Sequence, residues 1–159
     1  MLSHQIEEVP THVRGLPGSR VLRLERLRLV DHEPLAFIRT WLPAELKAVL
    51  PVECLVDASL HEQLRLRAGA VVSGGPRRIQ AVAAPPPIAA LLKVKKGSPL
   101  LLLEGESRDQ DGRVVEVFST WHRSDKVAFE LTVEPPERRG RDPRGGRSRP
   151  APRRGPSGP

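Results

Sequence analysis

Apolar and polar residues alternate along two stretches of the chain, and each stretch is followed by a second β-rich run. The first pair of runs is VLRLERLRLV from Val21 and LAFIRTWL from Leu35. The second pair is LLLLEGESR from Leu100 and RVVEVFSTWH from Arg113. A period of two is typical of a strand with one buried face. Asp-His and Asp-Gly stand between the runs at matching points, and Asp-Gly there is a hairpin signal. The pattern therefore predicts two β-hairpins.

The two hairpins are copies of one unit. GSRVLRLE begins at Gly18 and GSPLLLLE at Gly97, and both copies reach Thr-Trp near their ends, using the only two tryptophans of the chain. An apolar run precedes each copy, IEEV from Ile6 and IQAV from Ile79. Each copy is thus predicted to be a strand, a short connection and a hairpin, with its tryptophan as an anchor that packs on the sheet.

Helical patterns are short and lie between these strands. PPPIAALLKV predicts a helix that prolines open and Gly97 ends. SLHE at Ser59 is a capping box that predicts a second helix, ended by Gly69. The preceding segment, LPAELKAVLPVECLV, also has helical spacing, whereas PTHVRGLPG in the first copy is a marginal helix. KVAFELTVE from Lys126 alternates and predicts a further strand.

The expected fold class is α+β. About seven strands form a largely antiparallel sheet, with two or three short helices packed on it. We expect three segments: a lead-in over 1–17, a ligand-binding domain over 18–134, and a tail over 135–159.

The charge of the chain is concentrated in this tail. The formal net charge is +7, but 18 basic and 17 acidic residues precede Pro135, and 8 arginines and 2 acids follow from there. A segment so poor in apolar residues is predicted to be disordered. Its arginines suit non-specific contact with nucleic acid, and a solvated extension without a role is the alternative.

The sequence offers little for catalysis or metal binding. Cys54 is the only cysteine, which excludes an internal disulfide, and no Cys/His cluster or catalytic motif is present. No cofactor is expected. No apolar run approaches the ~20 residues that span a bilayer, and the N-terminus does not resemble a signal peptide. We expect a soluble, cytoplasmic protein without a membrane partner.

Four motifs together resemble the effector-binding UTRA domain of GntR-type transcription regulators of the HutC subfamily. They cover roughly residues 5–133 in family order: GSRVLRLERLRLVDHEPLAFIRTWLP from Gly18, ASLHEQL from Ala58, KGSPLLLLEGESRDQDGRVVE from Lys96 and STWHRSDKVAFEL from Ser119. The resemblance implies a chorismate-lyase-like fold, a small and often anionic metabolite as effector, and a homodimer.

The resemblance also implies what this chain lacks. Family members carry an N-terminal winged helix that reads DNA, so we expect no sequence-specific DNA binding by this chain alone. A truncated or stand-alone regulator and a misplaced start codon are both consistent with this. Ile38, His61 and Val127 depart from the family's pattern, which implies a changed ligand or degraded binding. A small chorismate-lyase-like enzyme and a decayed regulator fragment remain alternatives.

Five residues are candidates for effector binding. Arg26 and Arg28 share one face of a strand; if the strand is regular they lie beside core leucines and require an anion. A β-bulge near Glu25 and Arg26 would turn both to solvent instead.

The other three candidates have structural alternatives. Ser59 is a helix cap or an anion ligand. Glu116 is a solvent-exposed residue or a hydroxyl-binding carboxylate. Arg123 is an effector ligand or the partner of Asp125 in a turn. No catalytic and no metal-binding residue is predicted, and His61 and His122 are expected to be surface or hydrogen-bonded histidines.

Overall fold

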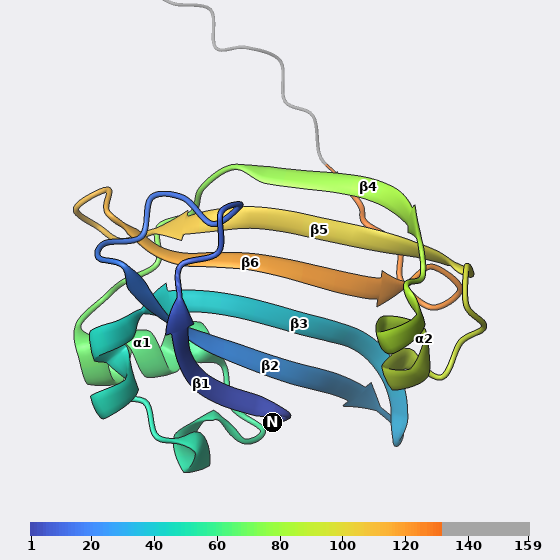
Figure 1. The fold of residues 1–159 in the computed structure, drawn as a ribbon, viewed down its shortest axis with the longest axis horizontal. Helices are drawn as coiled ribbons and strands as arrows, with labels where there is room; N and C mark the ends of the chain where they lie inside the picture. The colour runs from blue at the N-terminus through green and yellow to red at the C-terminus, as the bar shows by residue number, and fades with distance from the viewer. Residues whose placement is uncertain (132–159) are drawn as a thin grey trace, which may run out of the picture. The chain divides into compact units, whose positions relative to one another are not determined.

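Six antiparallel strands form one sheet in the order β1-β2-β3-β6-β5-β4. A computed structural model describes residues 1–131 (Figure 1). The strands are β1 (Ser3–Glu8), β2 (Arg20–Val30), β3 (Glu33–Pro43), β4 (Arg77–Ala83), β5 (Pro99–Arg108) and β6 (Val114–Arg123). The helices are α1 (Leu60–Ala68) and α2 (Pro86–Leu92), with two 3-10 helices, η1 (Ala44–Ala48) and η2 (Val52–Leu55). The predicted α+β class and antiparallel sheet are confirmed.

The sheet is built from two equivalent three-stranded halves that meet at β3 and β6. In this seam Phe37 pairs with Trp121 and Trp41 pairs with Val117. The repeat makes Trp41 equivalent to Trp121 and Phe37 equivalent to Val117, so exchanging the halves reproduces the pairing. The internal repeat of the sequence is therefore an approximate two-fold axis through the middle of the sheet.

Each tryptophan packs beneath the connection within its own half. Trp41 is 3% exposed and packs with Val13, which follows β1. Trp121 packs with Phe37 at a ring-centroid distance of 5.6 Å, next to the cluster formed by α2. Both indoles thus fill the space between the sheet and a connecting segment.

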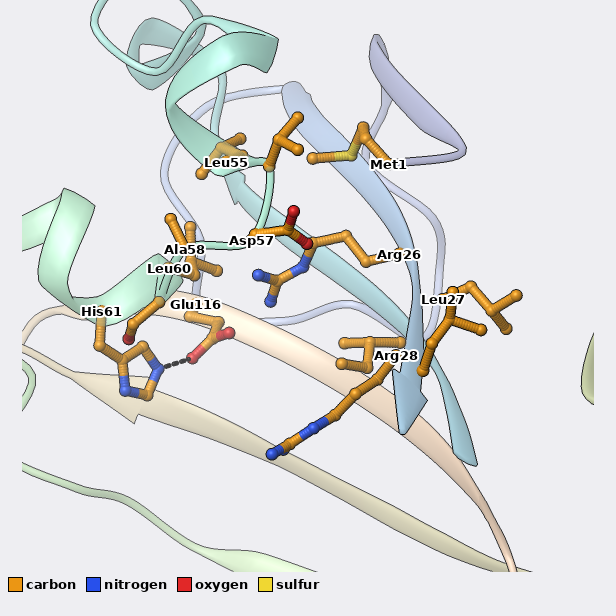
Figure 2. Close-up of a pocket in the computed structure, with 14 residues that line it drawn as sticks. Met1, Arg26, Leu27, Arg28, Leu55, Asp57, Ala58, Leu60, His61 and Glu116 are labelled. Atoms are coloured by element: carbon orange, nitrogen blue, oxygen red, sulfur yellow. Dashed lines mark hydrogen bonds and ion pairs between the residues drawn. The ribbon is translucent and has the colours of Figure 1, made fainter. Parts of the chain in front are cut away.

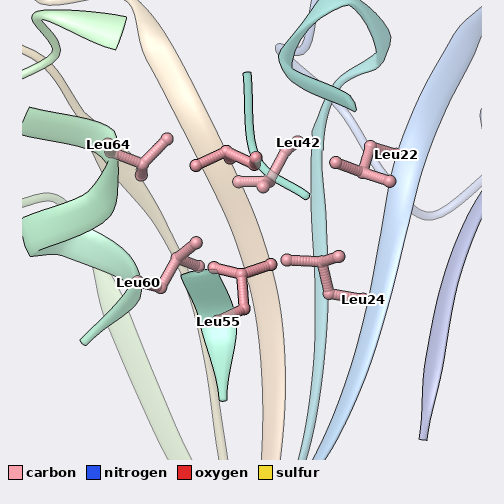
Figure 3. Close-up of a cluster of buried hydrophobic side chains, with 7 residues drawn as sticks. Leu22, Leu24, Leu42, Leu55, Leu60 and Leu64 are labelled. Carbon is pink, nitrogen blue, oxygen red and sulfur yellow. The ribbon is translucent and has the colours of Figure 1, made fainter. Parts of the chain in front are cut away.

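The two helices pack against opposite faces of the sheet. Leu22 and Leu42 contact α1 through a cluster of buried leucines (Figure 3). Phe37 and Leu100 instead pack with Ile88 of α2. Phe37 and Leu42 are five residues apart on β3, so their side chains point to opposite faces. Both sides of the sheet therefore have an apolar core.

Local signals define the limits of α1. Ser59 Oγ accepts a hydrogen bond from Glu62 N at 3.4 Å, and Gly69 ends the helix in the left-handed conformation with φ 64°. Both limits agree with the sequence prediction. The capping box is only half formed, because the Glu62 carboxylate pairs with Arg65 instead of reaching back.

Other predicted elements differ from the structure. The 44–55 segment forms 3-10 helices, α2 ends at Lys93 with φ 54° rather than at Gly97, and residues 9–19 form no helix. The strand predicted from Lys126 is absent over 127–131, where the Phe129 ring instead lies edge-on to His122 at 5.2 Å. An alternating apolar pattern indicates that one side of an extended chain is buried. Packing of the Phe129 ring can bury that side without hydrogen bonds to a neighbouring strand.

The predicted segments keep their status as predictions. Residues 3–8 of the lead-in form the edge strand β1, which pairs with β2. The tail over 135–159 and the last residues of the predicted domain lie outside the described residues. Within residues 1–131 no helix is long and apolar enough to span a bilayer.

Candidate functional site

A cavity of about 570 Å³ lies on the α1 face of the first half of the sheet. β2 supplies one wall, the loop from Leu55 to Ser59 and the start of α1 supply another, and Glu116 of β6 closes one side (Figure 2). Four of the five candidate residues line it: Arg26, Arg28, Ser59 and Glu116. The fold therefore brings together residues that lie up to 90 positions apart in the sequence.

Arg26 and Arg28 are on the cavity face because β2 is regular at these positions. The register between β2 and β3 runs without a break to Arg28 and shifts only between Arg28 and Leu29. The alternative of a bulge near Glu25 and Arg26 is therefore wrong: Arg26 is half-buried on the cavity face, and Arg28 lines the same cavity although it is exposed. They share their face with Leu22 and Leu24, as a regular strand requires.

The two guanidinium groups have no ion-pair partner among residues 1–131. Arg26 is partly buried and its Nε has no hydrogen-bond partner within this part of the chain. Burial lowers the pKa of Arg26 below its usual value, and the nearby Glu116 carboxylate acts in the opposite direction. Arg28 is more exposed. A cation held this way in a partly apolar cavity is stabilised by a bound anion.

Glu116 is buried, with an exposed fraction of 4%, so the solvent-exposed alternative is wrong. Its Oε2 accepts a hydrogen bond from Ser107 Oγ at 2.8 Å and lies 2.8 Å from His61 Nε2. The hydrogen bond to Glu116 raises the pKa of His61 above its usual value, while burial, Arg77 and Arg26 oppose the rise. The site therefore holds a carboxylate fixed by two partners beside two unpaired cations.

Ser59 and Arg123 have clear structural roles. Ser59 caps α1 at the rim of the cavity, so the cap and a position beside a ligand are compatible. Arg123 lies at the far end of β6 and is not a lining residue of the described cavity. It forms a two-point ion pair with Asp125, at 3.0 Å from Nε and 2.6 Å from Nη2. This is the turn interaction that the sequence offered as the alternative.

Sequence reasoning missed the role of His61. It is predicted only as a surface or hydrogen-bonded histidine, and it proves to be both: its side chain is 48% exposed and contacts Glu116. The two residues are 55 positions apart, and no local pattern connects them. Two signals point to it: its place in the first turn of a helix, two residues after the Ser59 cap, and its departure from the family's pattern at this position.

The second predicted histidine, His122, lies on the same face of the sheet. Burial and the positive charge of Arg28 lower its pKa below the usual value, which favours the neutral ring. Its Nε2 has no hydrogen-bond partner among the described residues. No group of three or more potential metal ligands occurs within residues 1–131.

Comparisons with known proteins agree with this architecture. The sequence profile of the UTRA domain matches residues 5–128. The chain is 28% identical over 139 residues to the HTH-type transcriptional regulator Rv0792c of Mycobacterium tuberculosis, aligning 84% of this chain with 51% of that protein. It spans about half the length of the curated relatives that it matches.

Solved structures give the same answer. The ligand-binding domain of a GntR-family regulator from Bordetella bronchiseptica superposes with a TM-score of 0.77 at 26% identity, covering 84% of this chain and 86% of that one. A transcriptional regulator from Streptomyces coelicolor superposes with a TM-score of 0.74 at 28% identity, covering 84% and 92%. The chain belongs to the UTRA domain family, as the effector-binding regulatory domain of a GntR-type transcription regulator.

Proposed function

We propose that the cavity binds a small anionic metabolite and that its occupancy is the regulatory signal. The observation that carries the proposal is the pair Arg26 and Arg28, two guanidinium groups on one cavity wall without a carboxylate partner among the described residues. Opposite them, Glu116 offers an acceptor for a hydroxyl or amino group. An anion contacting the arginines would form charge-assisted hydrogen bonds, which are about twice as strong as neutral ones.

The proposal includes the assembly in which the signal is used. A cytoplasmic homodimer would pass the signal to a DNA-reading domain, since the relatives are HTH-type regulators and this chain covers about half of their length. Two edge strands, β1 and β4, end the sheet and are available for cover by a partner. Residues 1–134 are almost neutral, so we expect this part to show no sequence-specific DNA binding at physiological salt.

A sensor is favoured over an enzyme. The relatives are regulators, and the ionisable groups that line the cavity can hold a ligand by charge and hydrogen bonds: Arg26, Arg28, Asp57, His61 and Glu116. The alternative of a small lyase is separated from a sensor by the fate of the ligand, because an enzyme converts it and a sensor returns it unchanged.

A thermal-shift panel of sugar phosphates, carboxylates and amino acids tests the proposal. A binding anion at a hundred times its Kd should stabilise the wild type by about 2.7 kcal/mol. In Arg26→Ala and Arg28→Ala the affinity should fall roughly ten- to a hundredfold, since each loses a charge-assisted hydrogen bond worth about 1.5–3 kcal/mol. NMR of the recovered hit distinguishes binding from turnover.

Arg20→Ala is the matched control, because Arg20 is exposed at the opposite end of the same strand. Its melting shift should equal that of the wild type. A hit that shifts all four proteins equally would show that the two arginines do not bind it. Absence of any anionic hit would favour a decayed effector site.

A further inference from the structure

The side chain of Arg77, on the edge strand β4, extends toward the cavity across Gly105, which has no side chain to block it. Arg77 pairs with Gly105 of β5, and its side chain crosses that residue along the face of the sheet. A Cβ at position 105 would lie 2.9 Å from Arg77 Cδ and would overlap the carbonyl oxygen of Pro76. The glycine is therefore what allows the arginine to lie flat on the sheet.

The guanidinium group is held on three sides. Its Cζ lies 4.8 Å from the centroid of the Phe118 ring, which is within cation–π range. Nη1 donates to the carbonyl oxygens of Pro76 and Glu106, and Nη2 donates to Ser107 Oγ at 3.1 Å. An arginine held by a ring and by backbone carbonyls has one defined orientation.

This contact and the Glu116 carboxylate together orient the Ser107 hydroxyl. A guanidinium group only donates, so Ser107 Oγ accepts from Arg77. A hydroxyl has one proton, and the remaining partner of Ser107 is Glu116 Oε2 at 2.8 Å. Ser107 therefore donates to Glu116, in a buried environment where both residues are at most 4% exposed.

Glu116 Oε2 then has two donors and Oε1 has none among the described residues. An ionised carboxylate only accepts, so His61 donates from Nε2 to Oε2. The other carboxylate oxygen points away from His61 into the cavity (Figure 2). The series Arg77, Ser107 and Glu116 thus leaves one acceptor atom directed at a ligand.

We propose that Arg77 is a positioning residue of the effector cavity: through Ser107 it fixes the Glu116 carboxylate, so that Oε1 is presented to a hydroxyl or ammonium group of the ligand. The role of Oε1 as an acceptor for a ligand rests on the proposed function. The positioning itself does not depend on which ligand binds, or on whether one does. It assigns a role in the cavity to an edge-strand residue that does not line it.

The protonation of His61 reports this positioning without any ligand. The charged groups that act on His61 are Glu116, Arg77 and Arg26. If the hydrogen bond from Arg77 orients and polarises the Ser107 hydroxyl, its loss weakens the hydrogen bond from Ser107 to Glu116. The carboxylate then binds His61 more strongly, which raises the pKa of His61. Removal of the positive charge of Arg77 acts in the same direction, so the two effects must be separated.

A double-variant comparison separates them. The His61 pKa is measured by NMR titration of its Cε1 proton in the wild type, Arg77→Met, Ser107→Ala and the double variant, all ligand-free. Arg77→Met should raise the pKa more when Ser107 is present than in the Ser107→Ala background, because only the former contains the hydrogen bond that Arg77 orients. Arg78→Met is the control; Arg78 is exposed like Arg77 but lies on the opposite face of β4, so its loss should leave His61 unchanged.

Equal shifts in the two backgrounds would overturn the proposal, because Arg77 would then act by its charge alone. If Arg77→Met does not fold, Arg77→Lys keeps the charge and the same comparison applies. This result is independent of the thermal-shift panel. A failure of anions to bind contradicts the proposed function, and an additive double variant contradicts the positioning role.

Discussion

The two halves of the sheet have equivalent strands but carry different chemistry at two pairs of equivalent positions. The first half has Arg26 and Arg28 on β2, and the second half has Gly105 and Ser107 on β5. Each pair follows a glutamate by one and three residues, Glu25 in the first half and Glu104 in the second. Both pairs lie on the same face of the sheet. One half thus supplies two cations, while the other supplies a glycine, which the Arg77 side chain crosses, and a hydroxyl. The repeat gives the sheet a symmetric scaffold, and the cavity lined by Arg26 and Arg28 lies on the first half of it.

The connections within the halves have also diverged. Residues 9–19 join β1 to β2 without a helix, whereas α2 joins β4 to β5. Both nevertheless cover a tryptophan on the same face of the sheet. Trp41 is four residues from Phe37 on β3, and Phe37 pairs with Trp121, so the two indoles point to the same side. The two tryptophans are therefore covered in the same way by segments of different secondary structure.

The largest expected effect comes from breaking the core that joins the halves. Phe37 belongs to the first half but is 1% exposed in the cluster around α2 of the second. Phe37→Ala should lower the free energy of unfolding by about 3–5 kcal/mol, measured by urea denaturation. Val117→Ala at the equivalent position should cost less, because Val117 is smaller and only partly buried. Equal losses would mean that the two sides of the seam are packed alike.

An intermediate effect is expected when a side chain is added at Gly105 in the second half. Gly105→Ala places a Cβ against Arg77 and Pro76, so it should destabilise the fold by about 1–3 kcal/mol in thermal or urea unfolding. In an Arg77→Ala background only part of this cost should disappear, because the carbonyl oxygen of Pro76 remains. An unchanged melting temperature would show that the glycine is not required.

The smallest effect concerns the contact between α1 and the second half. The pKa of His61 is raised by Glu116, so folding is favoured where His61 is protonated in the folded chain. This contribution is fully present below the unfolded pKa of about 6.5 and is lost as the pH rises through the higher folded pKa.

The measurement compares the wild type with His61→Gln on the two sides of this window. The difference in unfolding free energy should be below about 1 kcal/mol, because the exposed half of the His61 side chain screens the pair. It should be largest near about pH 5.5 and negligible above about pH 8.5, where the histidine is neutral in both states. A difference that does not vary with pH would exclude a charged pair.

Sequence reasoning recovered the elements whose signals are local. Alternation fixed the strands of both hairpins, and Ser59 and Gly69 fixed the ends of α1. It failed where tertiary packing decides: the run from Lys126 alternates correctly yet forms no strand over 127–131. The turn at Asp31 and His32 has positive φ at both residues, 49° and 64°, as a two-residue hairpin requires, although neither is glycine.

The site was partly predictable for the same reason. That Arg26 and Arg28 share a face follows from strand geometry, but whether that face is the cavity depended on β2 being regular up to Arg28. The register shift comes after Arg28, where Leu35 of β3 is left unpaired next to Pro34. The pairing of His61 with Glu116 and the path from Arg77 to Ser107 are long-range contacts that a single sequence does not encode in any local pattern.

The seam between β3 and β6 has a consequence for how the chain folds. Within each half, strands that pair are neighbours in the sequence, and the leucine cluster under α1 draws its buried members from residues 22–64. The β3–β6 ladder instead joins residues about 80 positions apart. Closing a long loop is the slow part of such a topology. We therefore expect each half to form early from local contacts, and the docking of the two halves, which also completes the cavity, to be the late step.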